Sequence, residues 1–420
     1  MEWHGVRIGR GILGIAERRG SRALRVIFAV ILSLIAGTAC AEATGPNSTD
    51  RKPAVPSKRV ALPDNVVPAD ANANAGTKNV LRMLYSLYAP REVSPLLVGQ
   101  NIGHASAVTY NAGDPFDLYQ SYIVDLEKQT GKRPAILALD YGWEEFDAHK
   151  ISRANSLIVE HWSKGGLVTI SMNPANPWTG VKGQRSLTTG TYDFADLFVK
   201  DSVPYRRLSA DLDAIAKGLQ ELSDAGVTVL WRPYHEMNGG WAWWSFDGKG
   251  DAISLITPEH YKQLWDFSFD YLVKTKALHN LLFVYSPNAT YGAQDAKSIA
   301  YYYPGSERVD VAAMDYYRDD MSQVNAGKDY DALVSLKKPI GFGEVGSAGR
   351  GPIDNLMLSR GATTDYPQMS FAVLWSGWSS LGGLVKTKKA IIENLNAKEF
   401  MNDPSMYTLT EVKHLREERK

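Results

Sequence analysis

The stretch "DLDAIAKGLQELSDAGVTVLWRPYHE" (211–236) contains one complete helix-to-strand unit. In its first part, Leu212, Ile215, Leu219 and Leu222 recur at helical spacing before Gly226, a pattern typical of an amphipathic helix that ends at a glycine. An apolar, β-rich run follows and ends in charged and polar residues. Repetition of this unit predicts a parallel sheet whose strands alternate with helices.

Seven further runs have the character of the strand at 228–236. They are 95–101, 134–142, 167–173, 281–288, 309–317, 339–346 and 369–377, and helical stretches separate most of them. No G-x-G-x-x-G motif follows the first run, so nothing favours a dinucleotide-binding sheet. Eight such strands predict an α/β fold, a (β/α)₈ TIM barrel that forms a single catalytic domain.

The overall charge restricts the partners. The chain has 46 Lys and Arg against 46 Asp and Glu, so it has no global basic field of the kind that nucleic-acid binders use. A neutral polymer or a small molecule fits this balance better, and we expect no nucleic-acid partner. We also expect a monomer.

The N-terminal region predicts export. Several arginines precede the apolar run "VIFAVILSLIAGTAC" (26–40), and small residues follow it, so we interpret 1–41 as a signal peptide and expect a secreted protein. The run is shorter than the ~20 residues that cross a bilayer. Cys40, the only cysteine, leaves a lipid anchor at the cell surface as an alternative and the only expected membrane contact.

The composition also sets the predicted domain boundaries. Residues 42–79 carry few large apolar side chains, which predicts a disordered linker. We place the catalytic domain at 80–400 and a C-terminal tail at 401–420, whose basic segment "KHLREERK" (413–420) we expect to be a solvated helix end.

Two glutamates stand where the chemistry of a barrel is carried out. Active sites lie at the carboxyl ends of barrel strands, and Glu236 and Glu344 directly follow apolar runs there. A buried acid costs several kcal/mol without a partner or a task; the alternative to a catalytic role is a salt bridge, for which Arg232 is available. Two carboxylates that face one cavity are what the cleavage of a glycosidic bond needs.

Neighbouring side chains extend the candidate site. The indoles of Trp241, Trp243 and Trp244 predict a platform for a sugar ring, although at least one of them is expected to pack inside the loop instead. Arg232 should share its face with Tyr234 and Glu236 by the period of two and orient a carboxylate. His235 should point the other way unless a bulge re-aims it.

At this point the sequence resembles a known family. "RPYHEMNGGWAWW" (232–244) and "GFGEVG" (341–346) are similar to the signature pair of family 26 glycoside hydrolases, mostly β-mannanases, and the resemblance extends over roughly 80–400. It implies a retaining mechanism with Glu236 as acid/base and Glu344 as nucleophile, without cofactor or metal. The expected substrate-binding residues are His235, Trp241, Tyr317, Trp375, Arg232, Trp244, Asn173, Trp178 and Asp315.

The resemblance is not complete. Met172 and Asn173 stand where many members have a Trp-His pair, and Ser245 stands where glycine is commoner. The resemblance implies a β-1,4-mannan or another mannose-containing polysaccharide cut internally as substrate. The departures leave a mixed-linkage β-1,3-1,4-glucan or a β-1,3-xylan as alternatives. Two other classes are a sugar-binding barrel that has lost catalysis and a metal hydrolase that uses His104, His161 and His235. No H-E-x-x-H spacing supports the latter.

Overall fold

The computed structural model describes residues 66–88, 94–106, 113–143, 145–180, 192–245, 257–294, 296–363, 365–380 and 385–417. The predicted signal peptide, Cys40 and most of the predicted linker lie outside these residues. Within the described part, no helix is both long and apolar enough to cross a membrane.

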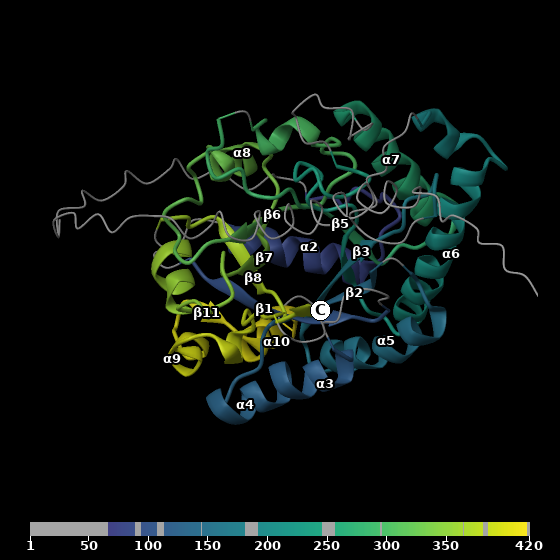
Figure 1. Ribbon diagram of the computed structural model, residues 1–420. Coiled ribbons are helices and arrows are strands. Elements are labelled where there is room, and N and C mark those ends of the chain that lie inside the picture. Colours follow the sequence, from purple (N-terminus) through teal and green to yellow (C-terminus); the bar gives the residue numbers. More distant parts are fainter. Residues whose placement is uncertain are drawn as a thin grey trace, which may run out of the picture. The chain divides into compact units, whose positions relative to one another are not determined.

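Eight parallel strands close into a barrel, which confirms the predicted fold (Figure 1). They are β1 (Leu96–His104), β2 (Ile136–Trp143), β3 (Leu167–Asn173), β4 (Val229–Arg232), β5 (Leu281–Tyr285), β6 (Val311–Tyr317), β7 (Ile340–Gly346) and β8 (Met369–Leu374). Each strand pairs with the next, and β1 pairs with β8, with Leu97 opposite Phe371. Every predicted strand overlaps an observed one.

Helices lie around the outside of the ring of strands (Figure 1). The α-helices are α2 (Ala75–Tyr88), α3 (Pro115–Tyr119), α4 (Asp125–Thr130), α5 (Ala148–Ser163), α6 (Val203–Asp224), α7 (Pro258–Asp270), α8 (Asp329–Ser335), α9 (Ala397–Met401) and α10 (Leu409–Glu417). Shorter π and 3₁₀ turns are η1 (Gln120–Val124), η2 (Phe194–Phe198), η3 (Tyr271–Thr275), η4 (Ile299–Tyr302), η5 (Leu358–Ala362) and η7 (Ile391–Glu393). Side-chain caps begin several of them: Ser202 starts α6, and Thr257 with Pro258 starts α7.

Apolar side chains fill the interior of the barrel and the space at the amino ends of its strands. Inward residues from several strands, such as Leu230, Val311 and Val373, form one buried cluster with Leu81 and Leu84 of α2. Helix α2 precedes β1 and contacts both β5 and β8. It therefore closes the amino end of the barrel, and the carboxyl ends of the strands remain as the place for a site.

The predicted linker boundary at residue 79 is wrong. The backbone N–H of Ala69 donates to Asp310 Oδ1 at 2.7 Å, Asp70 Oδ2 lies 2.7 Å from His279 Nδ1, and α2 begins at Ala75. Residues 66–74 hold their place through these polar contacts together with a few small apolar contacts, such as buried Ala73 and Val66 packed against the core. A prediction from low hydrophobicity could not register such contacts.

The predicted end of the domain at residue 400 is also wrong, whereas the described part of "KHLREERK" does form the largely exposed end of a helix, α10. Strand β11 (Met406–Tyr407) pairs in parallel with β1, with Met406 opposite Leu96. In α10, Val412 is buried, and the Arg416 guanidinium lies 3.5 Å from the ring centroid of Trp162. The barrel domain thus extends to residue 417. A two-stranded antiparallel hairpin of β9 (Ser379–Ser380) and β10 (Val385–Lys386) follows β8.

Candidate active site

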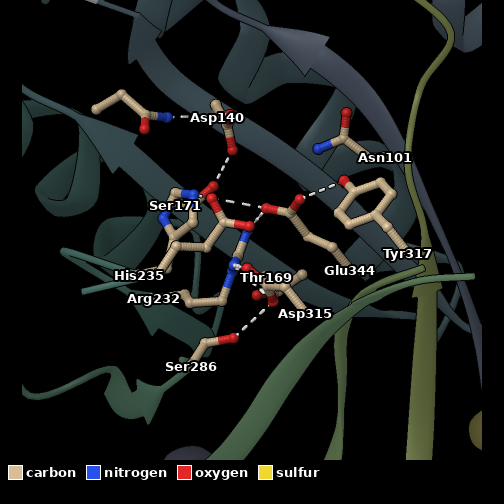
Figure 2. A network of polar contacts seen from close by, with 12 residues as sticks. Asn101, Asp140, Thr169, Ser171, Arg232, His235, Ser286, Asp315, Tyr317 and Glu344 are labelled. Carbon is tan, nitrogen blue, oxygen red and sulfur yellow. Dashed lines mark hydrogen bonds and ion pairs between the residues drawn. The ribbon is translucent and has the colours of Figure 1, made fainter. Parts of the chain in front are cut away.

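An ion-pair cluster lies at the carboxyl ends of three strands (Figure 2). Arg232 at the end of β4 donates from Nη2 to Glu344 Oε1 at 2.5 Å and from Nη1 to Asp315 Oδ2 at 3.0 Å. Asp315 of β6 stands opposite Glu344 of β7 in the sheet register. Ser286, just after β5, donates to Asp315 Oδ1 at 2.8 Å.

The guanidinium of Arg232 remains charged within this cluster. Burial disfavours its positive charge, but the carboxylates of Asp315 and Glu344 outweigh that effect and raise the pKa of Arg232. A planar guanidinium can serve two carboxylates at once, which a lysine ammonium does less well. Arg232 therefore fixes the orientation of Glu344, as predicted from the sequence.

The backbone of β7 at Gly343 passes close to the side chains of Ser286 and Asp315. A Cβ at Gly343 would lie 2.4 Å from Ser286 Oγ and 2.7 Å from Asp315 Oδ1. Both separations are shorter than any stable contact, so only a glycine lets β7 pass beside the Arg232 cluster.

The segment after β4 explains the dense motif at 232–245. The strand ends at Arg232, and Tyr234 and Glu236 adopt left-handed φ values of 47° and 55°, which cost a non-glycine residue on the order of 1–3 kcal/mol. Hydrogen bonds hold this conformation: Glu236 N donates to Ser286 O at 2.8 Å, and Trp244 Nε1 donates to His235 O at 2.8 Å.

This irregular backbone overturns the alternation expected beyond Arg232. Tyr234 turns into the core, where its hydroxyl lies 2.9 Å from Ser268 Oγ, whereas His235 Nε2 lies 3.5 Å from Glu344 Oε1. The expectation that His235 points away is therefore wrong, as is the shared face of Tyr234 and Glu236. Burial, Arg232 and His104 lower the pKa of His235 well below its usual value, so the imidazole is neutral beside the carboxylate.

Glu236 and Glu344 occupy different electrostatic settings. Burial is the main cause that raises the pKa of Glu236 well above its usual value, and the charges of Glu344 and Asp315 add to it. Trp241 Nε1 donates to Glu236 Oε2 at 3.0 Å and acts in the opposite direction. Glu236 is thus a carboxyl group that keeps its proton at a pH where an ordinary glutamate has lost it.

Glu344 instead receives hydrogen bonds that suit a carboxylate. In addition to Arg232, the Tyr317 hydroxyl donates to Glu344 Oε2 at 2.5 Å. Burial, followed by the charges of Glu344 and Glu236, raises the pKa of Tyr317 well above its usual value, so the phenol keeps its proton. The arrangement places a carboxyl group with a raised pKa and a carboxyl group that accepts from Arg232 and Tyr317 at one end of the barrel.

A family model described as "Glycosyl hydrolase family 26" matches residues 69–404. The chain belongs to glycosyl hydrolase family 26. A mannan endo-1,4-beta-mannosidase of Bacillus subtilis is 33% identical over 320 residues, which cover 74% of this chain and 82% of the relative. A second, of Bacillus subtilis strain 168, is 32% identical over 362 residues, which cover 82% of this chain and 92% of the relative. The solved structure of Bacillus subtilis mannanase BCman is similar with a TM-score of 0.67 and 30% identity, and the match covers 82% of this chain and 95% of that one.

The tryptophans of this family 26 glycosyl hydrolase divide into two groups. Trp241 is half-buried beside Glu236, but Trp244 is fully buried and Trp243 nearly so, and Trp243 Nε1 donates to Pro174 O at 2.9 Å. The prediction that Trp244 contacts substrate is therefore wrong, because its indole supports the loop from beneath. Trp178 is half-buried, and its ring packs edge-on against Trp243.

Other predicted residues lie at neighbouring strand ends. Trp375 follows β8, and its ring centroid lies 6.2 Å from that of His104 at the end of β1. His104 Nδ1 lies 2.9 Å from Asp140 Oδ2 at β2. Asn173 at the end of β3 donates to the same Asp140 oxygen at 3.5 Å. These residues thus continue the polar rim around the carboxyl end of the barrel.

Sequence reasoning gave no functional weight to Ser171, Ser286 and Tyr291. Ser171 donates a short hydrogen bond to Asp140, and the Tyr291 hydroxyl accepts from Tyr317 N at 2.8 Å. Serines at strand ends are common, and the left-handed backbone of Tyr291 leaves no sequence signal. Only the position of Ser286 directly after an apolar strand could have drawn attention to it.

The three histidines of the metal-hydrolase alternative do not converge. His161 Nε2 lies 3.3 Å from Ala135 O, just before β2, so this residue lies at the opposite end of the barrel. Atoms of His235, Glu236 and Asp315 do lie within 4.8 Å of one another. However, both oxygens of Asp315 already accept from the Arg232 guanidinium, so the positive charge that these acids require is already present.

Proposed function

We propose that this enzyme cleaves β-1,4-linked mannan internally by double displacement, with retention of anomeric configuration. The observation that carries the mechanism is the contrast between Glu236, whose raised pKa keeps it protonated, and Glu344, which accepts from Arg232 and Tyr317. Retaining glycosidases need one carboxylic acid and one carboxylate for the first step.

In the first step, a Glu344 oxygen attacks the anomeric carbon and Glu236 gives its proton to the departing glycosidic oxygen. The glycosidic C–O bond breaks, and a glycosyl ester on Glu344 forms. In the second step, Glu236, now a carboxylate, takes a proton from water as that water attacks the same carbon and releases Glu344. Before attack, His235 remains neutral beside Glu344 and adds no second charge to the nucleophile.

The choice of mannan rests on relatives. Both Bacillus subtilis relatives described above carry the name mannan endo-1,4-beta-mannosidase. The rival substrates are mixed-linkage glucan and β-1,3-xylan, because polar residues such as Asn173 do not by their chemistry distinguish mannose from glucose or xylose.

The substrate test is reducing-end release from mannan, lichenan and β-1,3-xylan, followed by product profiles on defined manno-oligosaccharides. We expect release from mannan, with products several sugars long that shorten with time. Exclusive release of monosaccharides would contradict internal cleavage, and preferential hydrolysis of another polymer would contradict the substrate.

The mechanistic test is proton NMR of the first product, which should be the β-anomer. Retention also requires the two carboxyl groups to lie roughly 5–5.5 Å apart. Glu236→Ala with azide and an activated aryl β-mannoside should give a β-mannosyl azide, because azide replaces water without needing a base. Formation of the α-anomer would overturn double displacement, and a wild-type protein that binds mannan but releases no reducing ends would support a binding function.

We also propose that residues 1–41 direct export and that the mature enzyme is a monomer. The basis for the proposed export is the arginine-rich start and the apolar run at 26–40. N-terminal sequencing of protein from culture medium should give a start after Ala41. Mass spectrometry of a membrane-bound form would instead reveal a lipid on Cys40, and light scattering would report the oligomeric state.

A further inference from the structure

Lys389 is a buried cation directly behind Glu344 and Tyr317. The residue follows the β9–β10 hairpin in the chain and is 5% exposed. Its ammonium group donates to Ser347 O at 2.7 Å, with longer contacts to Ser347 Oγ at 3.4 Å and Gly349 O at 3.5 Å. These acceptors lie just beyond β7, which carries Glu344, so Lys389 ties the end of that strand to the hairpin.

The same side chain packs against Tyr317. Lys389 Nζ lies 5.0 Å from the centroid of the Tyr317 ring, a favourable cation–π distance. A Cβ at Gly346 would lie 2.7 Å from that ring and 3.1 Å from Lys389 Cδ. The ring is thus held between the glycine backbone and the lysine, and this placement directs its hydroxyl to Glu344 Oε2.

The charge of Lys389 has no direct carboxylate partner. The ion pairs within the described ranges include none formed by Lys389. The titratable groups that face it are Tyr317, Asp319, Glu344 and Glu393, whose Oε2 accepts from the Lys389 backbone N–H at 3.2 Å. Burial lowers the pKa of Lys389 to about 8, and the charges of Asp319 and Glu344 oppose that shift.

A buried ammonium that has acceptor oxygens but no carboxylate partner is costly to keep charged, so this charge calls for a function. At the site, the single positive charge of Arg232 faces two carboxylates, Asp315 and Glu344. Lys389 supplies a second positive charge on the other side of Tyr317.

We propose that Lys389 is a positioning residue of this active site: it holds the Tyr317 ring against Glu344 and adds a second positive charge near that carboxylate. The inference rests on the proposed role of Glu344 as nucleophile. Lys389, which lies outside both signature motifs, would then affect the acid limb of the pH profile of activity.

The test compares Lys389→Met, which removes the charge and keeps an unbranched side chain, with Lys389→Arg. Lys388→Met is the matched control, because it makes the same substitution at the adjacent, exposed lysine. In Lys389→Met, the acid limb of kcat/KM should move upward by roughly one pH unit, about a tenfold loss of rate below the limb. Lys389→Arg and Lys388→Met should keep the wild-type limb. An unmoved limb in Lys389→Met would overturn the proposal, as would an equal loss at every pH with a lowered Tm, since that would mean packing alone.

A second readout does not depend on turnover. In protein labelled with ¹³C at the glutamate carboxyl carbon, Glu344→Gln identifies the Glu344 signal, and the midpoint of its titration should move to higher pH in Lys389→Met. A moved midpoint in an enzyme that hydrolyses no mannan would overturn the proposed substrate and leave the inference standing. An unmoved midpoint in an active mannanase would overturn the inference alone. Lys389→Gln takes the place of Lys389→Met in both measurements if circular dichroism shows that the methionine variant does not fold.

Discussion

Replacing Trp241 by phenylalanine should extend activity to higher pH. Glu236 has a raised pKa chiefly because it is buried, and the indole N–H of Trp241 is the hydrogen-bond donor that partly offsets this shift. Phenylalanine keeps an aromatic face beside the carboxyl group and removes the donor. The carboxylate form of Glu236 then loses stabilisation, so the acid keeps its proton to a higher pH.

The size of this shift follows from one hydrogen bond of 3.0 Å. A net contribution of ~0.5–1.5 kcal/mol to the carboxylate, divided by ~1.36 kcal/mol per pKa unit, gives an upward shift of ~0.4–1 unit. The alkaline limb of kcat/KM reports the acid in the free enzyme, so it should move by the same amount. Loss of sugar contact would lower kcat/KM at all pH values alike and leave the limb position readable.

The assay is a pH profile of kcat/KM for wild type, Trp241→Phe and the control Trp178→Phe. The control removes an indole whose N–H donates to Asp193 O, so its alkaline limb should stay in place. A limb that moves to lower pH in Trp241→Phe would mean that admitted water outweighs the lost donor. That result, or an unmoved limb, would refute the reasoning.

Three further substitutions test the ion-pair cluster of Arg232 and Glu344 and the buried Asp310 just before β6. Glu344→Ala should lower turnover by several orders of magnitude while calorimetry still detects oligosaccharide binding; near-wild-type turnover would remove it as nucleophile. Arg232→Met should cost about 3–5 kcal/mol in a urea titration because it leaves buried carboxylates without their cation, and a loss below 1 kcal/mol would contradict the pairing. Burial raises the pKa of Asp310 from 3.8 to about 6, so native protein binds the extra proton and the free energy of unfolding falls by up to ~3 kcal/mol as pH rises through this window. Asp310→Asn should flatten that fall in Tm measurements between pH 4 and 6, and an equal slope in both proteins would contradict the assignment.

The strands were readable from the sequence because each is an apolar run bounded by turn residues. A strand buried on both faces shows this signal most strongly, and all eight predictions overlap the observed elements. The prediction failed at the end of β4: the strand was expected to run to residue 236, but it ends at Arg232. The left-handed turns at Tyr234 and Glu236 arise from contacts with Ser286 and Trp244, which are distant in sequence or carry no local signal.

The candidate site shows the same division. Residue type and strand position were enough to select Glu236, Glu344 and Arg232, since buried charge at a strand end is costly without a purpose. The directions of individual side chains could not be predicted. The predictions that His235 points away from the site and that Trp244 contacts the substrate were therefore wrong. Lys389 had no signal at all, because a lysine after a hairpin is an ordinary surface residue until folding places it behind Tyr317.

The different settings of the two glutamates follow from where each one's partners originate. Glu344 lies within strand β7, so the pairing of the strands places its neighbours: Asp315 stands opposite it, and the side chains of Arg232 and Tyr317 reach it from β4 and β6. Glu236 lies beyond the end of its strand, and Trp241, on the same irregular loop, donates to its side chain. The paired strands of the barrel thus supply the charge and the donors that a carboxylate needs, and the loop after β4 supplies the desolvated setting that raises the pKa of Glu236. On this reasoning, changes that loosen the loop should shift the alkaline limb of activity, whereas changes within the sheet cluster should shift the acid limb.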